Sequence, residues 1–254
     1  MNAERWIYRY QLNNGSWVFT PNDALLDSGR KVSSILSSRW TAPSYYYHLQ
    51  KGGHVAALKL HFNSQYFIRT DIKRFFNSIS RTRVTRVLKP YFGYIAASDI
   101  AKYSTVRLPE TATKHVLPYG FPQSPIIASI CLNKSKLGKF IDDLASNENF
   151  KVSVYVDDIM ISSDSVGLLE STLTKLSKVA NDSKLPLNND KTVGPLAQVT
   201  AFNIDIAHTR LIINSTRYLT LHSSFLSSMP LGNVRKGIYS YVSTINKNQA
   251  KQLT

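Results

Sequence analysis

The tetrapeptide Tyr155-Val156-Asp157-Asp158 lies between two short runs in which apolar and polar residues alternate, residues 152–156 and 159–162. Alternation with a period of two predicts two β-strands, and the short connection predicts a hairpin with both carboxylates at its tip. Such turns are usually built from Asn-Gly or Asp-Gly, so an Asp-Asp pair carries a local conformational cost. Packing in a core does not explain two acids there. An exposed acidic turn and a metal site are the two interpretations that remain.

The composition favours a folded protein with a polyanionic partner. With 254 residues and 43% apolar side chains, the chain is long enough for one large domain or two modest ones. Its 31 Lys and Arg residues against 16 Asp and Glu give a formal net charge of +15, more than solubility requires. The basic residues are spread from Arg5 to Lys251, which indicates a positive surface or channel rather than a basic tail. The sequence shows no strongly basic amphipathic helix, and this disfavours a membrane surface as the partner.

The use of cysteine and the distribution of apolar residues indicate the compartment. Cys131 is the only cysteine, which excludes an intramolecular disulfide and a cysteine-based zinc cluster and suits the reducing cytoplasm. The N-terminal residues contain no apolar stretch of signal-peptide length, and no run of about 18 apolar residues occurs in the sequence. We therefore expect a cytoplasmic protein that does not bind or span a membrane.

The order of the expected elements indicates the fold class. They are an irregular lobe over residues 1–65, a strand at 66–70, a helix from the N-cap Ser80 to Leu88 that stops before Pro90, a helical segment from the N-cap Ser124 through Leu144, a helix at 166–181, and a hairpin with strands 199–206 and 210–214. From residue 216 onward the chain is basic and rich in serine, without a clear period. This order predicts an α+β protein in which an antiparallel sheet carries helices on one face.

A third carboxylate strengthens the metal interpretation. Asp71 ends the apolar strand predicted at 66–70. If that strand lies beside the hairpin, Asp71, Asp157 and Asp158 converge at one edge of the sheet, where they repel one another unless divalent cations neutralise them. Two hard cations about 3.5–4 Å apart are the usual arrangement for in-line displacement at phosphorus, in which one activates a 3′ hydroxyl and the other stabilises the pyrophosphate.

Four segments, residues 67–76, 117–125, 155–158 and 187–192, resemble four successive motifs of the reverse transcriptase family in their order and spacing. This resemblance implies the fingers and palm of a right-hand polymerase, with an antiparallel palm sheet, helices on one face, and a minimal or truncated thumb. The implied division is a fingers-like lobe at 1–65, a palm at 66–215 with fingers elements inserted at about 90–120, and a C-terminal connection or partial thumb at 216–254.

The resemblance also assigns the catalytic group. It implies that Asp71 and Asp157 are the principal metal ligands, that Asp158 is their partner, and that Ile72 belongs to the same metal site. The implied cofactor is a pair of Mg²⁺ ions, with Mn²⁺ as the alternative. The segment Leu187-Asn188-Asn189-Asp190-Lys191-Thr192 is similar to the family's Leu-Asn-x-x-Lys-Thr loop, in which the lysine is a candidate general acid for the leaving pyrophosphate. The alternative for Lys191 is an ordinary solvated lysine.

The residues expected to bind the nucleotide follow from two of the motifs. Phe76 lies five residues after Asp71, where an aromatic ring of the family excludes a 2′ hydroxyl and favours dNTPs; the alternative for Phe76 is core packing. In Leu117-Pro118-Tyr119-Gly120-Phe121-Pro122-Gln123-Ser124-Pro125, tyrosine replaces the glutamine that the family places before glycine, and Gln123 is a neighbour that could compensate. The basic candidates for the triphosphate, each of which is alternatively a solvated charge, are Lys51, Lys59, Arg69, Lys73 and Arg74.

The resemblance narrows to one branch of the family. The retron signature Val-Thr-Gly is absent near residues 201–205, which read Ala-Phe-Asn-Ile-Asp. The chain looks more like the bacterial abortive-infection and antiphage-defence reverse transcriptases related to retrons, without an assignable subtype. The implied partners are dNTPs, an RNA template or non-coding RNA, a DNA product, and a second copy or partner subunit. Because Tyr119 departs from the family pattern, both template-independent synthesis and priming from a protein hydroxyl stay open.

Two rival functions remain. An RNA-directed RNA polymerase is disfavoured by Phe76 and by valine where Gly-Asp-Asp would have glycine. A non-catalytic nucleic-acid-binding or assembly module is disfavoured by the three acids, because a module that needs only positive charge gains nothing from carboxylates near a polyanion.

Overall fold

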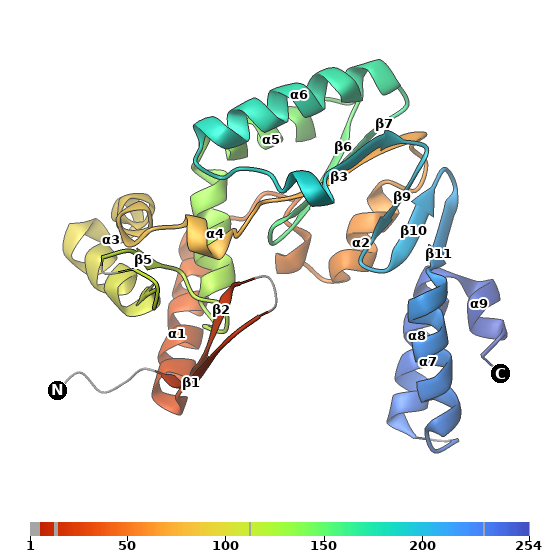
Figure 1. Cartoon of the computed structure of the whole chain (residues 1–254), viewed down its shortest axis with the longest axis horizontal. Helices are drawn as coiled ribbons and strands as arrows, with labels where there is room; N and C mark the ends of the chain where they lie inside the picture. The colour runs from red at the N-terminus through yellow and green to blue at the C-terminus, as the bar shows by residue number, and fades with distance from the viewer. Residues whose placement is uncertain (1–5, 13–14, 112, 231, 254) are drawn as a thin grey trace.

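The computed structural model describes residues 6–12, 15–111, 113–230 and 232–253. A four-stranded antiparallel sheet lies at the centre, with the strand order β6-β7-β3-β8 (Figure 1). These strands are β3 (Tyr66–Asp71), β6 (Lys151–Tyr155), β7 (Asp158–Ser163) and β8 (Val193–Leu196). The sequence-based prediction of an α+β fold with an antiparallel sheet is confirmed.

Strand alternation divides the central sheet into an apolar face and a polar face. Ile68, Ile159 and Ile161 are fully buried in the largest core, beneath the helices α4 to α6. The paired residues Arg69 and Met160, and after them Asp71 and Asp158, lie on the opposite face. The covering helices are α4 (Ser124–Asn133), α5 (Lys136–Ala145) and α6 (Val166–Asp182). Burial of one face therefore orients the acidic residues toward the other.

The hairpin differs from the prediction by one residue. Tyr155 pairs with Asp158, so the two turn residues are Val156 and Asp157, and Asp158 belongs to strand β7. Val156 has a φ of 61°, whereas the φ of Asp157 is not positive. A positive φ at the first turn position alone distinguishes a type II′ from a type I′ hairpin turn. Both registers keep the apolar residues of the two strands on one face, so the apolar pattern does not separate them.

The first 65 residues are mostly regular, which corrects the prediction of an irregular lobe. Helix α1 is capped by Asn22, whose side chain accepts a hydrogen bond from the backbone N–H of Leu25 at 2.9 Å. The helix buries only three of its residues, so its apolar period is weak. The elements of this part are β1 (Trp6–Gln11), β2 (Trp17–Pro21), α1 (Asp23–Arg39), the 3₁₀ helix η1 (Tyr47–Leu49) and α2 (Gly53–Leu60).

Two predicted helix boundaries are wrong. Ser80 caps α3 (Arg81–Ser104) as expected, but the helix continues past Pro90 and is interrupted at Gly93, which has a φ of 75°. Gly93 takes up the bend that was expected before the proline. Ser124 is the first residue of α4 rather than its cap, and the predicted segment 124–144 is two helices because Ser135 caps α5 by accepting from the N–H of Gly138. Shorter elements are η2 (Phe76–Ser78), β4 (Val106–Arg107), β5 (His115–Val116) and η3 (Asn189–Lys191).

The C-terminal part holds a second sheet and three helices. The strand predicted at 199–206 is itself a hairpin, because Phe202 and Asn203 both have positive φ and form its turn. The segment after residue 216, which showed no period, is helical. This part shares a core with α2 and with Phe67 and Met160 of the central sheet. Its elements are β9 (Gln198–Ala201), β10 (Ile204–Ala207), β11 (Arg210–Ile213), α7 (Ser215–Ser227), α8 (Asn233–Ile245) and α9 (Lys247–Lys251).

The helices of the described residues are too short or too polar to cross a lipid bilayer.

Candidate active site

Three carboxylates gather at one end of the central sheet. Asp71 is the last residue of β3 and pairs directly with Asp158, the first residue of β7, so both side chains leave the same face. Asp157 lies in the adjoining turn, where its backbone carbonyl accepts a hydrogen bond from the N–H of Ile72 at 3.0 Å. The sheet therefore brings together the three acids that the sequence singled out. Ile72 is fully buried, and only its backbone carbonyl could serve a metal.

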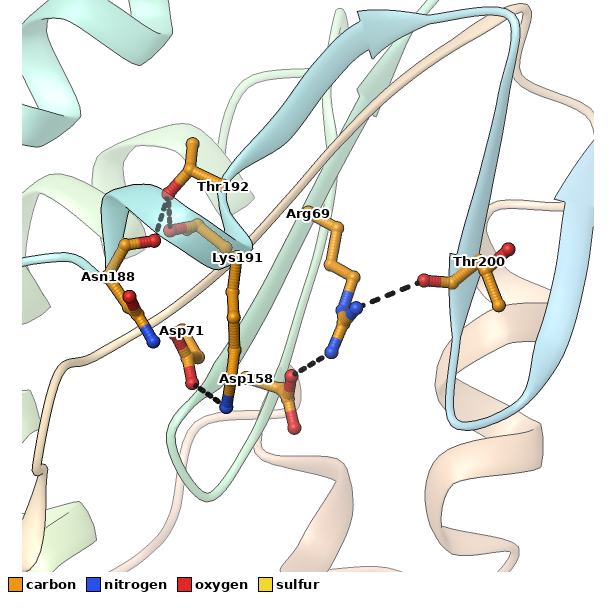
Figure 2. Close-up of polar contacts among 8 residues, drawn as sticks. Arg69, Asp71, Asp158, Asn188, Lys191, Thr192 and Thr200 are labelled. Atoms are coloured by element: carbon orange, nitrogen blue, oxygen red, sulfur yellow. Dashed lines mark hydrogen bonds and ion pairs between the residues drawn. The ribbon is translucent and has the colours of Figure 1, made fainter. Parts of the chain in front are cut away.

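Two cations contact this acidic group (Figure 2). The ammonium of Lys191 lies 2.8 Å from Oδ2 of Asp71, and the guanidinium of Arg69 lies 3.2 Å from Oδ1 of Asp158. Arg69 also donates to the backbone carbonyl of Thr200 in β9, at 3.2 Å. Arg69 was expected to bind triphosphate, and the structure pairs it with a carboxylate instead. Its position two residues before Asp71 in a strand placed it on the same face, which is the sequence signal that could have revealed the pairing.

The loop that carries Lys191 is tied to β3 by backbone and hydroxyl contacts. The N–H of Asn188 donates to the carbonyl of Asp71 at 2.9 Å. The hydroxyl of Thr192 donates to the carbonyl of Asn188 at 2.9 Å, so its oxygen accepts from the hydroxyl of Thr70 at 2.7 Å. These bonds fix the 3₁₀ turn η3 beside the carboxylates (Figure 2). The sequence motif contained both Lys191 and Thr192, but it gave no sign of Thr70 or of the hydrogen bonds through which the two threonines hold the loop.

Burial and crowding of like charges set the electrostatics of the site. Removal from water, followed by the charge of Asp158, raises the pKa of Asp157 to about 6. Burial also raises the pKa of Asp158, although Arg69 opposes the shift. The hydrogen bond to Asp71 raises the pKa of Lys191, which therefore stays protonated at neutral pH.

The donor set suits a hard divalent cation. Oδ1 of Asp71 is buried and has no hydrogen-bond partner, and Asp157 is hard to ionise without a positive charge nearby. Among the described residues, no three His, Cys, Asp or Glu side chains are close enough together to enclose an ion as they stand. Asp71 and Asp158 face Lys191 and Arg69 in this arrangement. The carboxylates thus have the chemistry of a magnesium site, while Lys191 and Arg69 neutralise the negative charges of Asp71 and Asp158.

Phe76 and Tyr119, two residues expected from the sequence to bind the nucleotide, form an aromatic pair. The rings of Phe76 and Tyr119 meet edge to face, with centroids 4.6 Å apart. Phe76 is only 7% exposed, so it packs in the core and also contacts the tyrosine that replaces glutamine. Gly120 has a φ of 99°, and a Cβ there would lie 2.2 Å from the backbone oxygen of Phe19 in β2. Glycine is therefore needed at residue 120 so that the β1–β2 hairpin can pack on this segment.

The structure does not bring every candidate to the carboxylates. The side chain of Gln123 is fully buried and donates to the hydroxyl of Ser104 at 3.3 Å. Lys51 and Lys59 lie exposed on the turn before α2 and on α2, and neither belongs to an ion pair among the described residues. Gln123 therefore does not replace the missing glutamine in this conformation.

Lys73 and Arg74 follow the acidic strand end directly. Lys73 is exposed, and its backbone N–H donates to the carbonyl of Pro186 at 2.8 Å. Arg74 has a φ of 49° and lines a cleft of about 440 Å³ under the β1–β2 hairpin, together with Asn77 and Lys114. Oδ1 of Asn77 is buried there without a hydrogen-bond partner. Arg74 is thus a predicted triphosphate ligand that borders an open space.

Comparisons with known protein sequences agree with this geometry. The family described as reverse transcriptase (RNA-dependent DNA polymerase) matches residues 24–219. The Retron Ec86 reverse transcriptase of Escherichia coli is 24% identical over 202 residues, which cover 76% of this chain and 60% of that protein.

Solved structures of similar fold come from telomerases and viruses. Telomerase from Candida albicans, in complex with a TWJ fragment of telomeric RNA, gives a TM-score of 0.56 at 12% identity. The alignment covers 91% of this chain and 47% of the telomerase chain. The foamy viral protease-reverse transcriptase, in complex with an RNA/DNA hybrid, gives a TM-score of 0.53 at 15% identity. That alignment covers 97% of this chain and 32% of the viral chain. The chain thus spans about 60% of the curated relative and less than half of either structure.

Proposed function

The chain belongs to the reverse transcriptase family, and we propose that it is a metal-dependent, RNA-directed DNA polymerase that transfers dNMP from dNTPs to a primer hydroxyl. The observation that carries the proposal is the meeting of Asp71, Asp157 and Asp158 at the open end of the sheet, beside Lys191. A nucleic-acid-binding module would gain nothing from three acids placed against a polyanion.

Each group at the sheet end has a part in the transfer. The oxygens of Asp71, Asp157 and Asp158, with the carbonyl of Ile72, would hold divalent ions. Bound Mg²⁺ would supply the charge that lowers the pKa of the attacking hydroxyl and offsets the negative charge on the leaving group. Lys191 is protonated and half-exposed, with 55% of its side chain accessible, so it can reach outward and give its proton to the departing pyrophosphate.

Substrate choice rests on the aromatic pair and on the basic residues nearby. Phe76, backed by Tyr119 at 4.6 Å, would sit against the sugar and exclude a 2′ hydroxyl. Arg74 in its cleft and the exposed Lys73 are the best-placed groups for the triphosphate. Lys51, Lys59, Gly120 and Gln123 complete the proposed substrate-binding set.

The remaining assignments extend the proposal to the whole chain. Residues 1–65 would act as fingers, 66–215 as palm with inserted fingers elements, and 216–254 as connection or partial thumb. The net charge of +15 supports an RNA template or non-coding RNA as partner, with a DNA product. The motif resemblance supports a role in bacterial antiphage defence. The single, buried Cys131 supports a cytoplasmic location.

The test is incorporation of labelled nucleotides on a primed RNA template, with each dNTP and each NTP and with Mg²⁺ or Mn²⁺. Wild type is compared with Asp157→Ala and with Asp182→Ala, a matched control at an exposed aspartate that ends α6. We expect dNMP incorporation by wild type and the control, and none by Asp157→Ala. Preference for NTPs would instead identify an RNA polymerase, and RNA binding without incorporation by any protein would favour a binding module. Omission of template then separates templated from template-independent synthesis.

A further inference from the structure

A partly buried histidine contacts the turn that carries Asp157. His48, in the 3₁₀ helix η1, accepts a hydrogen bond at Nδ1 from the backbone N–H of Val156 at 3.0 Å. Its Nε2 lies 2.8 Å from the hydroxyl oxygen of Ser129 in α4. One imidazole thus connects the acidic turn to the helix that follows the Tyr119 segment.

The donor and the acceptor of each hydrogen bond from Val156 through His48 to Ser129 are fixed. The hydroxyl of Ser129 donates to the carbonyl of Pro125 at 2.9 Å, so its oxygen can only accept from His48. Nε2 of His48 must therefore carry the proton, which leaves Nδ1 free to accept from Val156. Burial lowers the pKa of His48 to about 4, in keeping with this neutral form.

The turn itself has a conformation that requires support. Val156 is β-branched and adopts a φ of 61°, a left-handed conformation that such residues rarely enter. Neighbours hold it on both sides: His48 binds the N–H of Val156, and Ile72 binds the carbonyl of Asp157. The N–H of Val154 also donates to the carbonyl of Tyr45 at 2.8 Å, so the segment before His48 runs beside β6.

We propose that His48 is a positioning residue for the turn Val156–Asp157: its imidazole holds the strained backbone and thereby fixes the carboxylate of Asp157 for chemistry. The consequence for activity rests on the proposed polymerase function, whereas the bond to Val156 does not. Because Ser129 lies on α4, the same chain of bonds keeps the turn in register with the Tyr119 side of the site. Neither His48 nor Ser129 touches the reacting atoms.

A packing role for the ring is the competing explanation, since His48 also meets the rings of Tyr46 and Tyr155 edge to face. Two variants separate the explanations. His48→Phe keeps an aromatic ring and removes both hydrogen bonds. His48→Asn loses the ring but keeps an oxygen acceptor about where Nδ1 stands. If packing matters, Phe is the better substitute; if the bond to Val156 matters, Asn is.

The experiment measures kcat, KM for dNTP and the Mg²⁺ concentration for half-maximal rate. The proteins are wild type, His48→Phe, His48→Asn and Ser129→Ala, with His115→Phe as a control at a partly exposed histidine of β5. Thermal unfolding checks that each variant is folded. We expect His48→Phe to lower kcat by about 10- to 100-fold, as loss of a supporting partner of a metal ligand does, and to raise the Mg²⁺ requirement. KM should change less than about threefold, and His48→Asn should recover most of the loss.

A spectroscopic readout tests the bond without relying on activity. In ¹⁵N NMR, His48 should show a protonated Nε2 and an unprotonated Nδ1, and the amide of Val156 should exchange faster with solvent in His48→Phe than in His48→Asn. A protonated Nδ1, or a Val156 amide that is the same in all variants, would overturn the proposal even if the wild type proved inactive. So would an active wild type whose folded His48→Phe variant keeps full kcat.

Discussion

Replacing Gly120 by alanine should loosen the β1–β2 hairpin from the active site. The new Cβ would lie 2.2 Å from the backbone oxygen of Phe19 and 3.1 Å from its carbonyl carbon, and backbone cannot rotate away as a side chain can. The φ of 99° adds the cost of a left-handed conformation, about 1–3 kcal/mol. Overpacking of a tight contact adds about 1–3 kcal/mol. We therefore expect Gly120→Ala to lower the free energy of unfolding by about 2–6 kcal/mol.

Urea unfolding followed by circular dichroism measures this change, with Gly167→Ala as the control. Gly167 lies in α6, has an ordinary φ, and its added Cβ would meet no atom within 4 Å. Alanine there should stabilise the helix by about 0.5–1 kcal/mol. If Gly120→Ala is folded and loses less than about 1 kcal/mol relative to the wild type, the close approach of β2 does not explain this glycine. A KM for dNTP equal to that of the wild type would likewise show that the position of the β1–β2 hairpin does not affect nucleotide binding.

Four further predictions concern single groups. Lys191→Met should lower kcat by about 100-fold or more as a lost general acid. It should also lower the unfolding free energy by about 1–3 kcal/mol, because the side chain of Asp71 is only 7% exposed and loses its ion-pair partner; a variant as stable as the wild type would contradict this. Phe76→Ala should narrow the preference for dNTP over NTP in a competition assay, and an unchanged ratio would reject the steric role. Since Asp157 has a pKa of about 6 and metals bind its ionised form, the Mg²⁺ dissociation constant from calorimetry should rise about tenfold per pH unit below 6 and be flat above it. Burial lowers the pKa of His61 to about 3 and that of His48 to about 4, so each should make stability fall as pH drops from about 6.5, by up to about 1.4 kcal/mol per unit. His61→Phe should therefore reduce the slope to the part that His48 contributes, and an unchanged slope would contradict this.

The sequence predicted the elements whose residues are buried in a regular pattern. Strand β3 and helix α6 lie where alternation and helical spacing placed them, since each buries one face in the largest core. The helices of the C-terminal part were not predicted from the sequence; α7, for example, buries only Leu221 and Phe225. A helix with so few buried side chains leaves a weak apolar period among its serines and threonines.

The candidate site was predictable as a set of residue types but not as a set of contacts. Asp71 and Asp158 are adjacent because two strands pair in one register, which the strand pattern and the motif order together indicated. The supports of the site gave no such signal. His48 reaches Val156 across 108 residues, and Thr70 reaches Thr192 across 122. Hydrogen bonds between residues so far apart in the sequence depend on the tertiary structure, so no local sequence pattern predicts them.

The two cations at the acidic group differ in how firmly the fold holds them. Arg69 makes two contacts, one with Asp158 and one with the carbonyl of Thr200, and its side chain is only 27% exposed. Lys191 makes one contact, with Asp71, at the end of a flexible side chain that is 55% exposed. Solvent weakens the pair on the lysine side, but the side chain of Asp71 is only 7% exposed, so its carboxylate needs another positive charge once Lys191 leaves. Arg69 ties the acidic strand end to β9, whereas the ammonium of Lys191 is free to leave the carboxylate when a substrate phosphate or a metal ion competes for it.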